Sequence, residues 1–176
     1  MKQYYQDAAL TIRDLCAEDI PLLVAAECAQ GWHATPEKLE NRLRDVERRG
    51  AVVIAAVTDG VPVGYVSVYP DAVSGPFVGT GWPEIVDFNV LVKYRRRGIG
   101  SRLMDCAEQI AAQYADTVTL GVGMHSGYGA AQRLYVLRGY VPDGSGVWVG
   151  DRIGEPYAMC ENGDSLVLHL SKKLQH

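Results

Sequence analysis

The sequence predicts a mixed α/β fold built on one sheet, within a single domain that covers residues 1–176. Strand-like and helix-like hydrophobic patterns alternate along the chain, as they do when helices connect the strands of one sheet. The hydrophobic content of 48% and the charged content of 22% are ordinary for a globular domain. A chain of this length can also bury a sizeable core.

The first fifty residues predict one strand followed by two helices. Residues 10–14 alternate enough for a short strand, and residues 19–30 have the pattern of a helix. The second helix has clear end signals: Thr35 is a suitable N-cap and Pro36 suits the first helical position. This helix is predicted to stop at Gly50.

A hairpin and a long loop follow. Two apolar stretches, residues 51–57 and 61–69, flank Asp59 and Gly60, which favour a tight hairpin turn. Residues 70–83 are rich in Gly and Pro and show no periodicity, so they are predicted to form a loop. Long loops in compact domains are often functional.

The second half alternates strands with two further helices. The predicted elements are a strand at 84–92, a helix at 99–114, a strand at 117–122, a helix at 129–138 and a last strand at 165–170. Gly139 suits a left-handed helix cap. The stretch that begins at Val141 is expected to contain mainly glycine-rich turns.

The distribution of charge excludes general nucleic-acid binding. The whole chain has 17 basic and 21 acidic residues, for a net charge of -4, and four of the basic residues, Lys93, Arg95, Arg96 and Arg97, lie within five positions. Proteins that bind nucleic acids along a face spread their basic residues over it. Any contact with phosphate is therefore expected to be local.

Compartment and metal content are predicted from absences in the sequence. No apolar run approaches the roughly 20 residues that cross a bilayer, and the first residues lack the apolar stretch of a signal peptide. Its four cysteines, Cys16, Cys28, Cys106 and Cys160, show no C-x-x-C spacing. We therefore expect reduced thiols in a cytoplasmic protein, with neither a metal site nor a membrane partner.

The segment from Val90 to Leu103 contains the clearest candidate binding site, a basic glycine-containing turn between a strand and a helix. The N-terminus of a helix exposes N–H groups and the positive end of the dipole, which bind phosphate. Gly98 and Gly100 allow close backbone approach, and the arginines add charge. No Gly-Lys-Ser/Thr follows, and Leu103 replaces the third glycine of a dinucleotide motif. A solvated basic loop is the alternative.

Two motifs resemble those of the GNAT superfamily of N-acetyltransferases. Residues 95–100, Arg-Arg-Arg-Gly-Ile-Gly, match the signature R-x-x-G-x-G/A. Residues 131–140, Ala-Gln-Arg-Leu-Tyr-Val-Leu-Arg-Gly-Tyr, are similar to A-x-x-L-Y-x-x-x-G-F/Y. The resemblance covers roughly residues 10–174, although specific matching is confined to residues 84–140.

This resemblance implies a fold and a cofactor site. The fold is a mostly antiparallel, seven-stranded sheet splayed between its fourth and fifth strands, with about four helices and acetyl-CoA in the cleft. The N–H groups of residues 96–101 would hold the CoA pyrophosphate, and the backbone of two strand residues would pair with the pantetheine arm. The residues so assigned are Val90, Val92, Arg95, Arg96, Arg97, Gly98, Ile99, Gly100 and Ser101.

The resemblance also implies two groups that handle protons. Tyr135 occupies the position of the acid that protonates the departing thiolate, and a phenol with a pKa near 10 suits that task. Glu84 lies 14 positions before Gly98, the spacing of the catalytic glutamate in the family's histone-modifying members. A buried core tyrosine and a solvated strand-end carboxylate are the respective alternatives.

Other residues remain open as bases. Asp87 lies on the opposite face of a regular strand from Glu84, although a bulge would change that. His125 is a second candidate base, with a surface histidine as its alternative, and a chain of water molecules is also open as the acceptor of the proton. Tyr128 stands where the family often has Asn, and it is a candidate for the acceptor pocket instead.

Trp32, His33 and Trp82 fall where the family usually binds its acceptor. Aromatic side chains with a carboxylate suit a primary amine on a small molecule or a peptide N-terminus, and we expect a small-molecule amine as acceptor. Two alternatives stay open: acetylation of a protein lysine or N-terminus, and a CoA-binding sensor without turnover. The sequence also leaves open an acyl group other than acetyl, and a homodimer.

Overall fold

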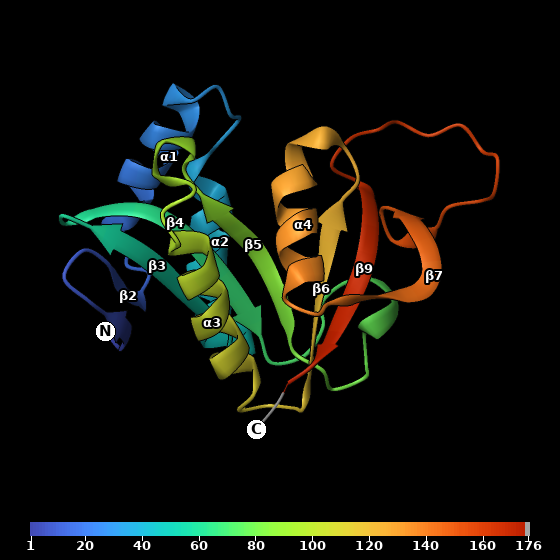
Figure 1. Ribbon diagram of the computed structural model, residues 1–176, viewed down its shortest axis with the longest axis horizontal. Coiled ribbons are helices and arrows are strands. Elements are labelled where there is room, and N and C mark those ends of the chain that lie inside the picture. The colour runs from blue at the N-terminus through green and yellow to red at the C-terminus, as the bar shows by residue number, and fades with distance from the viewer. Residues whose placement is uncertain (175–176) are drawn as a thin grey trace. The chain divides into compact units, whose positions relative to one another are not determined.

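The computed structural model describes residues 1–174, and the chain forms two compact units (Figure 1). The first contains Met1–Tyr69 and Ile85–Ile110, and the second contains Pro70–Glu84 and the chain from Ala111 onward. The predicted α/β class is confirmed, since four helices and mainly antiparallel strands are present in the described residues. These residues form nine strands rather than the expected seven.

The two units have separate strand orders. In the first unit the order is β1 (Gln3–Gln6), β2 (Thr11–Asp14), β3 (Val52–Thr58), β4 (Val61–Tyr69) and β5 (Glu84–Val90). The pairings β1–β2, β2–β3 and β3–β4 are antiparallel. Asp59 (φ 51°) and Gly60 (φ 76°) form the predicted hairpin turn, with the positive φ angles that a two-residue turn of this kind requires.

Helices cover both faces of the first unit's sheet. The helices α1 (Asp19–Ala29) and α2 (Pro36–Arg49) share an apolar cluster with β3 and β4, and α3 (Ile99–Ala111) lies on the other face (Figure 1). Adjacent residues of β4 show this division, because Tyr65 joins the cluster whereas a Cβ at Gly64 would lie 3.3 Å from the side chain of Leu103. The cluster comprises Leu15, Ile20, Leu23, Leu39, Val53, Ala55, Val57 and Tyr65.

The second unit contains β6 (Thr117–Gly123), β9 (Leu166–Lys173), β7 (Val141–Val149) and β8 (Arg152–Ile153), in that order. All three of these neighbouring pairs are antiparallel. The helix α4 (Gly129–Leu137) is tied to the end of β6 by a hydrogen bond from Gln132 Nε2 to the carbonyl of Gly123. As predicted, Gly139 follows α4 with φ 88°.

Three sequence predictions were wrong at the level of elements. β1 was missed because its sequence, Gln-Tyr-Tyr-Gln, has no apolar alternation. The region from Val141 forms the nine-residue strand β7 rather than turns; residues 143–146 bulge opposite the single residue His169, with Gly144 at φ 90° and Gly146 at φ 89°. β5 ends at Val90 rather than at Val92, and Val92–Tyr94 form a 3₁₀ turn.

Within residues 1–174, no helix has both the length and the apolar character needed to cross a membrane.

Candidate active site

The turn between β5 and α3 has the backbone shape expected of a phosphate site. Arg96 (φ 61°) and Gly98 (φ 81°) are both left-handed, which folds the chain tightly just before α3. The N–H of Arg102 donates to the carbonyl of Gly98 at 3.0 Å, which opens the helical hydrogen-bond pattern. The preceding N–H groups therefore lie at the positive end of the α3 dipole.

The charges of this turn are exposed. Arg95, Arg96, Arg97 and Gly98 all face solvent, whereas Ile99 is buried and begins α3. Apart from Gly98 itself and its two neighbours in the chain, no described residue has an atom within 4 Å of a Cβ built at Gly98. A phosphate group therefore fits in front of the turn, where guanidinium groups can surround it.

The second glycine of the motif has a different role. A Cβ at Gly100 would lie 3.1 Å from the ring of Phe88 and 3.7 Å from the side chain of Val90. Gly100 thus allows α3 to pack closely on β5. Of the two glycines, Gly98 leaves space for a ligand and Gly100 sets the distance between helix and strand.

A concave surface of about 590 Å³ lies beside the turn. Two of its aromatic rings are covered by arginines: Arg97 lies 5.5 Å from the ring centroid of Tyr94, and Arg102 lies 4.8 Å from that of Tyr5. Gly98 and Ser101 contribute to the same surface. It extends the cationic area of the turn towards the β1–β2 hairpin.

The backbone groups assigned to the pantetheine arm already have partners. The N–H of Val92 donates to Oε1 of Gln30 at 2.9 Å, and Nε of Arg95 donates to the carbonyl of Val90 at 2.9 Å. The guanidinium of Arg95 also lies over the ring of Trp32, 5.4 Å from its centroid. Trp32 therefore contacts the phosphate turn. His33, the neighbouring acceptor candidate, is exposed.

Sequence reasoning missed Glu27, a buried carboxylate in the first unit. Glu27 is 6% exposed, and its Oε1 accepts hydrogen bonds from the hydroxyl of Tyr65 at 2.9 Å and from Nδ2 of Asn89. A signal was present in the sequence, because Ile20, Leu23 and Glu27 share the buried face of α1. A carboxylate on the apolar face of a helix needs partners, and two strands supply them here.

Asp87 causes a local irregularity in β5. Its φ of 56° is left-handed, which a regular strand does not accommodate. Its carboxylate is held by Nε of Arg42 and, at 3.2 Å, by Nζ of Lys38, both from α2. Arg42 also donates to the hydroxyl of Tyr69 at 2.9 Å. Burial, together with the hydrogen bond to Asp45, raises the pKa of Tyr69 to about 12.

Glu84 anchors a loop in the second unit. Its side chain is buried, and its carboxylate accepts hydrogen bonds from the N–H of Val73 (2.7 Å), the N–H of Ser74 (3.2 Å) and Oγ of Ser74 (2.8 Å). It is not the solvated strand-end carboxylate considered as the alternative. Its role as a base stays a prediction. In the same loop, Trp82 packs on Phe77 with ring centroids 5.8 Å apart.

Tyr135 is buried in α4. It is 5% exposed, and its ring centroid lies 5.7 Å from that of Tyr140. Burial, with a smaller contribution from Tyr128, raises the pKa of Tyr135 well above its ordinary value. The phenol therefore keeps its proton throughout the neutral range, as a proton donor must.

His125 and Tyr128 are joined to each other through Asp164. Oδ1 of Asp164 lies 3.0 Å from Nε2 of His125 and accepts a hydrogen bond from the Tyr128 hydroxyl at 3.0 Å. The N–H of Gly127 donates to Nδ1 of His125 at 3.1 Å. Both ring nitrogens of His125 therefore have partners, which favours an ordering role at the start of α4.

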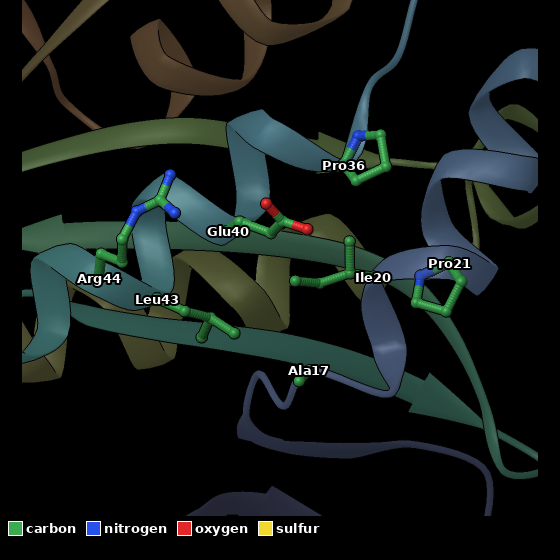
Figure 2. Close-up of a pocket in the computed structure, with 7 residues that line it drawn as sticks. All are labelled: Ala17, Ile20, Pro21, Pro36, Glu40, Leu43 and Arg44. Carbon is green, nitrogen blue, oxygen red and sulfur yellow. The ribbon is translucent and has the colours of Figure 1, made fainter.

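A groove of about 450 Å³ lies between α1 and α2 and contains none of the predicted site residues (Figure 2). Ile20, Pro21, Pro36 and Leu43 make its walls mainly apolar, and Glu40 and Arg44 line it from α2. Among residues 1–174, no group of three or more His, Cys, Asp or Glu side chains is placed to hold a metal.

Comparisons with known proteins agree with the geometry of the turn. The model of the acetyltransferase (GNAT) family matches residues 17–140, more than half of the chain, so the protein belongs to this family. The class is therefore that of acetyl-CoA-dependent N-acetyltransferases. No curated protein sequence matches the chain.

Solved structures show the same fold at low sequence identity. Ard1 from Thermoplasma volcanium is 20% identical with a TM-score of 0.68, covering 96% of this chain and 100% of its own. Ribosomal-protein-alanine N-acetyltransferase from Brucella melitensis is 22% identical with a TM-score of 0.64, covering 93% and 99%. The yncA structure from Salmonella typhimurium, which contains acetyl-CoA, is 17% identical with a TM-score of 0.66, covering 95% of each chain.

Proposed function

We propose that the protein, acting as one domain over residues 1–176, transfers the acetyl group of acetyl-CoA to a primary amine on a small molecule. The observation that carries this proposal is the exposed cationic turn, with open space at Gly98 and three arginines around it. Such a turn suits the pyrophosphate of CoA. Its residues from Arg95 to Ser101 are the proposed phosphate site.

The proposed reaction is direct attack within a ternary complex. The amine nitrogen forms a bond to the thioester carbon, and the bond from that carbon to sulfur breaks. Before the attack a base takes one proton from the amine, which is mostly ammonium at neutral pH. After the attack the nitrogen loses a second proton to solvent, Tyr135 donates its proton to the departing thiolate, and solvent reprotonates Tyr135. A backbone N–H of β5 would stabilise the oxyanion. The position of Tyr135 in the A-x-x-L-Y-x-x-x-G-F/Y motif supports its part in this scheme, although burial raises its pKa above the value near 10 that matches a thiolate.

Two carboxylates compete for the role of base. Glu84 is the candidate from family resemblance, but its oxygens accept three hydrogen bonds from the loop. Glu27 is the candidate from contacts, since Tyr65 and Asn89 both donate to its Oε1, and a buried carboxylate attracts an ammonium group. The pH–rate profiles of Glu84→Gln and Glu27→Gln decide between them. The variant that loses the acidic limb identifies the base.

A protein acceptor is the second candidate function. Two structural neighbours are a ribosomal-protein-alanine N-acetyltransferase and an acetyltransferase for the N-terminal serine of ribosomal protein L7/L12. This similarity favours an α-amine as the competing acceptor. The four free cysteines of the chain are compatible with the cytoplasm, where both kinds of acceptor are found.

Release of free CoA with a panel of acceptors tests the proposal. The panel contains polyamines, amino sugars, a lysine peptide with a blocked N-terminus, and peptides that begin with Ala or Ser. Higher kcat/KM for a small amine supports the proposal, and a preference for the free peptide N-terminus replaces it with the second candidate. Binding of acetyl-CoA without turnover on any acceptor would indicate a sensor. Sedimentation of the same sample tests the homodimer.

A further inference from the structure

Two side chains occupy the end of β5 where the pantetheine arm is expected. Arg95 donates from Nε to the carbonyl of Val90, and Gln30 accepts the N–H of Val92 with its Oε1, both at 2.9 Å. Gln30 follows the last residue of α1, whereas Arg95 belongs to the phosphate turn. The two strand groups expected to meet the cofactor are thus held by residues from different elements.

The amide of Gln30 has one unused donor. Because the N–H of Val92 can only donate, the oxygen of the Gln30 amide must face it, and this fixes where Nε2 lies. Nε2 is buried and has no hydrogen-bond partner among the described residues. Buried N–H groups are rarely left unpaired, so this donor indicates a missing acceptor oxygen. The pantetheine arm contains two amide carbonyls.

Arg95 makes a contact that an anion can displace. Its guanidinium is charged, whereas the carbonyl of Val90 and the ring of Trp32 are neutral partners. A hydrogen bond from the guanidinium to phosphate joins two opposite charges, an attraction that the neutral carbonyl of Val90 does not offer. Its position in the turn places Arg95 close to the proposed pyrophosphate site. Pyrophosphate therefore competes directly with Val90 for this side chain.

We propose that Arg95 couples the two halves of the cofactor site. When the pyrophosphate binds, Arg95 leaves the Val90 carbonyl and the Trp32 ring and moves to the phosphates. The Val90 carbonyl then accepts from a pantetheine amide, and Nε2 of Gln30 donates to a pantetheine carbonyl in place of the occupied N–H of Val92. This inference rests on the proposed function, because it requires that the turn binds CoA.

The main consequence is positive cooperativity between the two halves of CoA. Binding of the ADP part raises the affinity for the pantetheine part, and linkage requires the reverse effect to be equal. The experiment uses ADP and acetyl-pantetheine as separate probes, measured by isothermal titration calorimetry. In the wild type, saturating ADP should tighten acetyl-pantetheine binding at least about five-fold, within the usual range of coupling between sites.

Arg95→Ala removes the side chain that is proposed to couple the two halves of the cofactor site. In this variant acetyl-pantetheine alone should bind more tightly than in the wild type, ADP should no longer change its affinity, and intact CoA should bind more weakly because a phosphate contact is lost. If ADP still tightens acetyl-pantetheine in Arg95→Ala as it does in the wild type, the proposal is overturned.

Arg97→Ala is the matched control. It removes the same charge from the same turn, but its guanidinium lies over Tyr94. We expect weaker ADP binding in this variant with the coupling retained. Loss of coupling in Arg97→Ala would show a general effect of charge, and would overturn the specific role of Arg95.

Gln30→Glu tests the donor. The new carboxylate still accepts the N–H of Val92 but has no hydrogen to donate. Acetyl-pantetheine should bind several-fold more weakly in Gln30→Glu, while ADP affinity stays the same. Wild-type affinity for acetyl-pantetheine in this variant would exclude Gln30. If the wild type bound neither ADP nor CoA, the proposed function itself would fail. If it bound both, but ADP did not change the affinity for acetyl-pantetheine, only the proposed role of Arg95 would be contradicted.

Discussion

The turn at residues 91–98 and the loop at residues 70–83 both contain a glycine in the left-handed conformation, Gly98 at φ 81° and Gly75 at φ 68°. In the turn, the surroundings are open, since nothing lies within 4 Å of a Cβ at Gly98. In the loop they are filled: a Cβ at Gly75 would lie only 2.2 Å from the ring of His169. Glu84 adds three hydrogen bonds to the same loop.

This difference indicates that the two irregular segments have different roles. The turn keeps its arginines exposed and leaves space, which suits a ligand that arrives from solvent. The loop buries Ala72 and Phe77, and two of its backbone N–H groups donate to Glu84, so its contacts stabilise the fold. Substitutions in the turn should therefore alter binding, and substitutions in the loop should alter stability.

The largest expected effect is the loss of turnover in Tyr135→Phe. It is an exception to the division between binding and stability, because Tyr135 is buried and has a proposed chemical role. Tyr135→Phe removes only the hydroxyl from a side chain that is 5% exposed. Loss of a general acid typically lowers turnover by about 10²-fold or more, whereas loss of one hydroxyl changes the free energy of unfolding by about 1 kcal/mol. Single-turnover kinetics measures the first effect and a urea titration the second, and the affinity for acetyl-CoA should change much less than turnover. Undiminished turnover would remove Tyr135 as the acid.

The sequence predicted best those elements whose ends have local signals. Thr35, Pro36 and Gly50 bounded α2 correctly, and the Asp59-Gly60 turn placed β3 and β4 within one residue. β7 could not be read in this way, because its glycines serve a bulge opposite His169, a partner far along the chain. Local patterns do not contain such pairings.

The residues of the candidate site also differ in whether local sequence signals could predict them. The basic, glycine-containing turn was predictable because its residues are consecutive, and the structure shows it with Gly98 left-handed and the arginines exposed. Its binding of phosphate stays a prediction. The setting of Glu84 was not, since its donors, Val73 and Ser74, come from a loop without periodicity. Glu27 depends on Tyr65 and Asn89, which only the tertiary fold brings to it.

A matched pair of glycine substitutions tests the comparison directly. Gly75→Ala introduces strain at a positive φ and a clash with the His169 ring, so we expect a loss of about 3 kcal/mol in the free energy of unfolding. Gly98→Ala has only the backbone strain and should cost about 1 kcal/mol. CoA affinity should fall clearly in Gly98→Ala alone. Equal stability losses, or weaker binding in Gly75→Ala only, would contradict the comparison.

Glu84→Gln tests whether Glu84, which anchors the loop, also acts as the base. A glutamine keeps one acceptor oxygen but places an NH₂ group against N–H donors, so we expect about 1–3 kcal/mol of destabilisation. If Glu84 is only an anchor, the pH–rate profile keeps its shape and the melting temperature falls. If it is the base, the acidic limb flattens in protein shown to be folded by circular dichroism. Glu27→Gln provides the parallel measurement.

The smallest expected effect concerns the pH dependence of the loop's packing partner. Burial lowers the pKa of His169, and the nearby Asp143 opposes this shift without cancelling it. The unfolded chain takes up a proton near the ordinary value of 6.5, whereas the folded protein holds the imidazole neutral to lower pH. The contribution of His169 to stability is therefore complete above pH 6.5 and is lost as the pH falls below it. Urea titrations at pH 7.5 and 5.5 should show a larger loss in the wild type than in His169→Gln, which cannot titrate. Equal losses in the two proteins would mean that the loop packs on His169 without making the fold sensitive to pH there.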